Sequence, residues 1–85
     1  MNAKRAVIAA IYTQVDAPDW AATNLDALAD VLRDLSWLPI GPVTINLPDL
    51  AELTDDQREA VRSVLAQAVR ETAATGRPVK WRATR

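Results

Sequence analysis

The stretch NLDALADVLRD, residues 24–34, decides how this chain is interpreted. It predicts a helix over residues 23–35 whose apolar stripe consists of Leu25, Leu28, Leu32 and Leu35. A second stripe consists of Asp26, Asp30 and Asp34. Side chains four residues apart are neighbours on a helix, so each adjacent aspartate pair repels by roughly 0.2–0.5 kcal/mol. Stability alone does not favour this stripe, whereas binding of a positively charged partner does.

The composition limits the possible function classes. The chain has 85 residues, of which 49% are apolar, so we expect one small domain over residues 1–85 with its own core. It contains no cysteine and no histidine, which excludes disulfides and removes the commonest general base and zinc ligand. We therefore expect no enzyme, no cofactor and no metal site.

The charges are unevenly distributed, although the formal net charge is only −1. Residues 16–34 carry five acids and one base, Arg33, whereas residues 77–85 carry four bases and no acid. This pattern indicates an acidic region and a basic end. The basic end contains one aromatic residue, Trp81, so nucleic acid is not an expected partner.

The apolar residues 6–12 follow Lys4 and Arg5 and faintly imitate a signal peptide. The run has only the minimum length for such a segment, and no convincing cleavage site follows it. No apolar stretch is long enough to span a bilayer. We expect a cytoplasmic protein without a membrane partner.

The first half of the chain predicts a strand followed by a loop and the helix already described. Residues 5–12 are interpreted as a strand buried on both faces, and residues 14–22 as a loop. Either Thr23 or Asn24 is suited to cap the helix, because both side chains accept hydrogen bonds from free backbone N–H groups.

The second half predicts two further strands around a second helix. Residues 43–47 alternate like a strand, Thr54 and Gln57 form a capping box, and Gly76 ends the helix before a strand over residues 79–83. The order is thus β-α-β-α-β, and crossover helices imply parallel strands. We predict an α/β fold in which two main helices pack on a three-stranded parallel sheet.

Two side chains outside the aspartate stripe suggest binding. Trp20 lies beside Asp19 in the adjoining loop, and indole with carboxylates suits a basic protein surface. Glu71 lies late in the second helix, where the helix dipole disfavours an acid. The alternatives are that Trp20 packs onto the core and that Glu71 is simply solvated.

The segment PDWAATNLDALAD, residues 18–30, resembles the signature of the barstar family, small intracellular inhibitors of secreted bacterial ribonucleases. The family pattern is roughly Pro-x-Tyr-Tyr-Gly-x-Asn-Leu-Asp-Ala-Leu-Trp-Asp, and its Asn-Leu-Asp-Ala-Leu-x-Asp core is present without a gap. Ala21 and Ala22 replace the Tyr-Gly pair, and Ala29 replaces the tryptophan. The segment before this motif is shorter than in the best-known member, so we expect the family's first helix to be missing or reduced.

The resemblance implies inhibition of a secreted, guanyl-preferring microbial ribonuclease. The free monomer would form a 1:1 complex and block the active site with the acidic helix and the adjoining loop. Asp30 matches the family's central anchor and Asp26 a second contact. The remaining partner-binding residues implied are Trp20 as a stacking group, Asn24 in the binding loop and Glu71 as an acid from the last helix.

Three other functions remain open. The same face would suit an immunity protein or antitoxin against a different basic toxin. Asp26 and Asp30 would hold Mg²⁺ in a small phosphohydrolase, although a third clustered ligand is lacking. The acidic stripe would also pair with the basic end of a second copy in an assembly domain.

Overall fold

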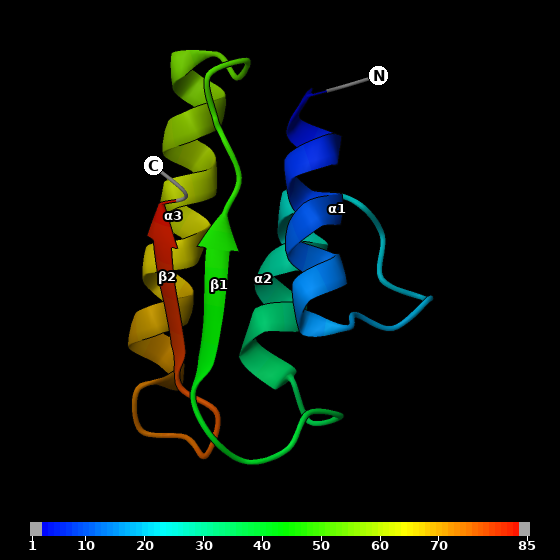
Figure 1. Ribbon diagram of the computed structural model, residues 1–85, viewed down its shortest axis with the longest axis vertical. Coiled ribbons are helices and arrows are strands. Elements are labelled where there is room, and N and C mark those ends of the chain that lie inside the picture. The colour runs from blue at the N-terminus through cyan, green and yellow to red at the C-terminus, as the bar shows by residue number, and fades with distance from the viewer. Residues whose placement is uncertain (1–2, 84–85) are drawn as a thin grey trace.

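A computed structural model describes residues 3–83 as three helices and two strands in the order α1-α2-β1-α3-β2. The elements are α1 (Ala3–Val15), α2 (Leu25–Asp34), β1 (Val43–Leu47), α3 (Asp55–Thr72) and β2 (Val79–Ala83). The two strands pair in parallel, with Val43 opposite Val79 and Leu47 opposite Ala83. Figure 1 shows α2 to the right of β1, next to α1, and α3 at the left behind β2.

Helix α1 corrects the interpretation of the first segment. Residues 5–12 belong to this helix, so the predicted strand there, the three-stranded sheet and the missing first helix are all wrong. The buried positions Val7, Ile8, Ile11 and Val15 are spaced one, three and four residues apart, which is helical spacing. A short apolar run does not distinguish a buried strand from a helix, and here the interspersed alanines favour the helix.

A side chain closes the edge of β1 that faces away from β2. The Gln14 amide nitrogen donates to the Asn46 carbonyl at 2.7 Å, and the Gln14 amide oxygen accepts the Asn46 N–H at 2.7 Å. One residue of a neighbouring antiparallel strand would make the same two hydrogen bonds to Asn46. Helix α1 therefore ends the sheet through one glutamine.

The capping box of α3 confirms the predicted helix start. The Thr54 hydroxyl accepts the Gln57 N–H at 3.1 Å, and the Thr54 N–H donates to the Gln57 side chain at 3.0 Å. Asp55 and Asp56 follow in the first turn, where the helix dipole favours negative charge. Strands β1 and β2 also have the predicted bounds.

The far end of α3 is tied directly to β2. The helix ends at Thr72, four residues before the predicted Gly76. The buried Thr72 hydroxyl donates to the Ala68 carbonyl at 2.6 Å and accepts the Val79 N–H at 2.9 Å. This threonine therefore fixes the start of β2 relative to α3.

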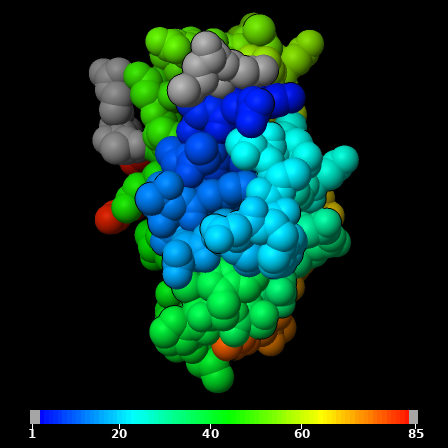
Figure 2. Space-filling model, turned by 90° about the vertical axis from the view of Figure 1, so that its right-hand side faces the viewer, coloured from blue at the N-terminus to red at the C-terminus, as the bar shows by residue number. Residues whose placement is uncertain are grey.

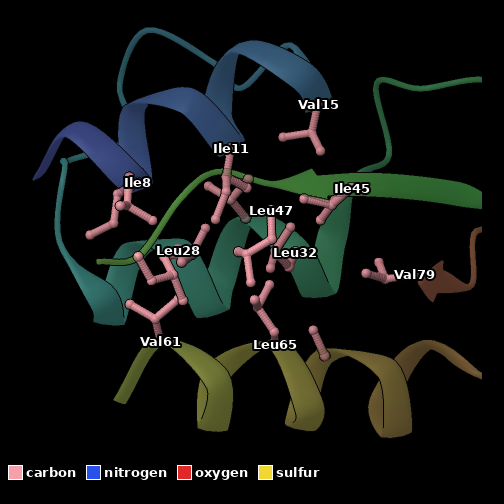
Figure 3. Close-up of a cluster of buried hydrophobic side chains, with 14 of the residues drawn as sticks. Ile8, Ile11, Val15, Leu28, Leu32, Ile45, Leu47, Val61, Leu65 and Val79 are labelled. Carbon is pink, nitrogen blue, oxygen red and sulfur yellow. The ribbon is translucent and has the colours of Figure 1, made fainter. Parts of the chain in front are cut away.

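The core lies among all three helices and β1. Figure 3 shows α1 and α3 on opposite sides of it, with β1 and α2 in between. Its fully buried members include Ile8, Ile11, Leu28, Leu32, Ile45 and Leu65. From the predicted stripe of α2, Leu28, Leu32 and Leu35 are buried, whereas Leu25 is half-buried. Burial of this stripe turns the aspartates of α2 outward.

We predict that Gln14→Ala opens the edge of β1. Loss of its two hydrogen bonds to the Asn46 backbone lowers the free energy of unfolding by about 1–3 kcal/mol, and the open edge promotes self-association. Urea unfolding followed by circular dichroism measures the first effect, and analytical ultracentrifugation the second.

Thr13→Ala is the matched control, because its hydroxyl bonds within α1, to the Ala9 carbonyl at 3.0 Å. Equal stability and equal self-association of the two variants would contradict the edge-closing role of Gln14.

Candidate protein-binding site

The outward face of α2 is acidic. Asp26, Asp30 and Asp34 are all exposed, on the side of the helix opposite the buried leucines. Because α2 packs against both α1 and α3, this face is held on a rigid element instead of a free loop. The aspartates therefore form a fixed acidic surface between two flanking helices.

Asn24 determines where α2 begins. Its backbone is extended, and its side-chain oxygen accepts the Ala27 N–H at 2.8 Å. This is the geometry of a helix N-cap, so Asn24 and not Thr23 caps the helix. Asp26 then falls in the first turn, over the positive end of the helix dipole. Asn24 thus has a structural role, and it is also exposed to solvent.

Trp20 projects from the loop between α1 and α2. Its side chain is 72% exposed, so Trp20 does not pack onto the core. The Tyr12 hydroxyl donates to the Ala22 carbonyl at 2.7 Å, and this bond attaches the loop to α1. Figure 2 shows the loop, coloured cyan, at the surface beside α1. By contrast, Trp37 and Trp81 are half-buried against the core.

Arg33 links α2 to α3 through two acids. It pairs with Asp30 one turn earlier on α2, and its Nε lies 3.7 Å from a carboxylate oxygen of Glu71. Glu71 also accepts a hydrogen bond from the Gln67 amide at 2.7 Å. The contact between Arg33 and Glu71 was not predicted from the sequence, although the spacing of three residues between Asp30 and Arg33 was an available signal for their pair. Asp30 and Glu71 therefore lie on two sides of one guanidinium.

A small hollow separates α2 from α3 beside this network. It has a volume of about 20 Å³ and is lined by Ala29, Arg33, Val64, Gln67, Ala68 and Glu71. The short side chain of Ala29 leaves this space at the position where the family pattern has a tryptophan. A volume of this size is close to that of a single water-sized sphere.

Tyr12 brings α1 into the electrostatic environment of Asp30. The side chain is half-buried, and burial raises the pKa of Tyr12 above its ordinary value of 10.0. The negative charge of Asp30 raises this pKa further, because it disfavours a phenolate nearby. Asp30 thus interacts with both flanking helices, with Tyr12 on α1 and through Arg33 with Glu71 on α3.

The predicted site residues come from three parts of the chain. Asn24, Asp26 and Asp30 lie along α2, and Glu71 reaches the same surface from α3. Trp20 belongs to the loop, and within residues 3–83 no hydrogen bond or ion pair joins it to the acids.

Two kinds of feature are absent from residues 3–83. No group of three or more acidic, histidine or cysteine side chains lies close enough to hold a metal ion. None of the three helices combines the length and apolar character that a bilayer crossing requires.

Comparison with known proteins adds one match. The family model Barstar, described as barstar (barnase inhibitor), matches residues 1–83. No curated protein and no solved structure matches the chain. The family match confirms the resemblance and extends it well beyond residues 18–30.

We predict that the pKa of Tyr12 depends on Asp30. Tyr12 is the only tyrosine, so the absorbance of its phenolate reports one group. The titration midpoint is expected above 10.0 in the parent chain and lower in Asp30→Asn. Because the folded pKa is raised, the stability linked to neutral Tyr12 is present below the unfolded pKa and is lost as the pH rises through the folded pKa.

Asp34→Asn is the control, since it removes an equal charge from the same helix. Identical midpoints in the two variants would show that Asp30 does not act on Tyr12.

Proposed function

The chain belongs to the barstar family, and from this premise we propose that it inhibits a secreted, guanyl-preferring microbial ribonuclease. In this proposal the chain is no catalyst. A single copy binds one enzyme molecule in the cytoplasm, where α2 and the preceding loop enter the active-site cleft and exclude RNA.

The observation that carries the proposal is the fixed acidic face of α2. Asp26 and Asp30 are exposed on a helix that is held on both sides, and Glu71 adds a carboxylate from α3. A binding surface on packed helices is already in its bound shape, so little conformational entropy is lost when the complex forms.

Mimicry of the RNA backbone is the proposed mechanism. A ribonuclease cleft carries arginine and lysine side chains that hold phosphate groups, and carboxylates form short, charge-assisted hydrogen bonds with the same groups. Asp30 is the proposed anchor, because it lies between Tyr12 on α1 and, across Arg33, Glu71 on α3. Asp26 and Glu71 would bind further cations around it.

Trp20 and Asn24 complete the proposed interface. The exposed indole of Trp20 would stack on an aromatic ring or a cation at the rim of the cleft. Asn24 would hold the first turn of α2 at the angle at which Asp26 and Asp30 point into the cleft.

Clustered acids would also control the speed of binding. A negative surface attracts a basic enzyme during diffusion, and salt screens that attraction. The association rate should therefore fall as the ionic strength rises. Rapid capture suits a protein that protects its own cell from a ribonuclease.

The test begins with a titration of the purified chain against a panel of small, secreted, guanyl-preferring bacterial ribonucleases. RNA cleavage is followed at low and at moderate salt, and stoichiometric loss of activity is expected for at least one enzyme. If none is inhibited, the ribonuclease proposal fails and a different basic toxin becomes the next candidate for the same face.

We predict that Asp30→Ala weakens binding to an inhibited enzyme by at least about 2 kcal/mol, roughly 30-fold. Asp34→Ala removes an equal charge from the end of the same helix, and its effect should stay below about 1 kcal/mol, because rim charges contribute little. Inhibition constants measured at one salt concentration give the comparison. Equal small effects of the two substitutions would exclude Asp30 as the anchor.

A further inference from the structure

The two acids assigned to the partner already bind a cation within the chain. Arg33 pairs with Asp30, and its Nε lies 3.7 Å from Glu71. The Arg33 side chain is half exposed, so the pair is accessible to a partner. Arg33 also lines the hollow beside Ala29, which places its side chain between the two helices.

Arg33 is also the only base in the acidic region. Residues 16–34 contain five acids and no other base. Its guanidinium therefore relieves part of the repulsion among the aspartates of α2, and it does so at the positions proposed for partner cations. A cation that approaches Asp30 and Glu71 meets a like charge already in place.

We propose that Arg33 is a specificity-determining residue that occupies the place of the partner's cation between Asp30 and Glu71. This inference rests on the proposed function. A partner whose cleft presents closely spaced cations displaces Arg33 from both carboxylates and is favoured over other cationic partners. A partner with one isolated cation is disfavoured, because its cation and the Arg33 guanidinium then lie beside the same carboxylate and repel each other.

The cost of displacement is small, since exposed ion pairs contribute little to stability. Arg33 therefore lowers affinity by a modest factor and does not prevent binding. Replacement of Arg33 by an uncharged side chain of similar length should strengthen binding to cationic ligands by about two- to fivefold beyond the effect of net charge alone.

The variants for this test are Arg33→Met, Arg33→Lys and the control Arg62→Met. Arg62 is exposed on α3, nine residues before Glu71, which is about 13 Å along the helix axis. Arg33→Met and Arg62→Met change the net charge equally, so their difference isolates the position. Arg33→Lys keeps the charge but lacks the planar fork that reaches two acids. Circular dichroism verifies that each variant is folded.

The first measurement needs no ribonuclease. The ¹⁵N-labelled chain is titrated with a hexa-arginine peptide at low salt and followed by nuclear magnetic resonance. Arg33→Met should bind the peptide about two- to fivefold more tightly than Arg62→Met, with the largest chemical-shift changes near Asp30 and Glu71. The affinity of Arg33→Lys should lie between those of the parent chain and Arg33→Met. Equal affinities, or weaker binding by folded Arg33→Met, would overturn the proposal.

The second measurement uses any ribonuclease that the parent chain inhibits. Arg33→Met should associate faster than Arg62→Met, and an unchanged or slower rate would overturn the proposal. If no ribonuclease is inhibited but the peptide result holds, the ribonuclease function fails while the competing role of Arg33 stands. The two conclusions are therefore separable.

Discussion

Burial of the apolar stripe of α2 is the constraint on which the rest of the structure depends. Leu28 and Leu32 of this stripe, together with the neighbouring Val31, are almost inaccessible to solvent in the core between α1, α3 and β1. Each such side chain contributes roughly 1.5–3 kcal/mol through burial, so α2 cannot rotate without a large loss of stability. The same helix therefore holds Asp26 and Asp30 at defined positions on the surface. Core packing and the presentation of the acidic face are two results of one arrangement.

Helices α1 and α3, which flank α2, connect it to the sheet, to the loop of Trp20 and to Glu71. Helix α1 closes the edge of β1 through Gln14 and supports the loop of Trp20 through Tyr12. Helix α3 supplies Glu71, and Arg33 holds it close to Asp30. Mutual repulsion among the acids is thereby lowered, whereas their exposure to solvent is retained.

The sequence predicted most of the local structure correctly. Periodicity and capping residues located α2, α3 and both strands, because these signals act over a few neighbouring residues. The error at residues 5–12 has a physical cause: Val7, Ile8 and Ile11 lie close together in an apolar run that fits a strand and a helix alike. The interspersed alanines favour the helix only weakly, and the packing of this run against β1 and α2, which is tertiary, decides between the two.

For the candidate site, the sequence by itself determined which residues share the outward face of α2. Asp26 and Asp30 follow from helix geometry alone, whereas the structure decided that Asn24 caps the helix and Thr23 does not. The tertiary structure decided that Glu71 meets Asp30 across Arg33 and that Trp20 is exposed. It also decided that a glutamine side chain ends the sheet. These features join residues far apart along the chain, and local propensities carry no information about which distant side chains come together when a core forms.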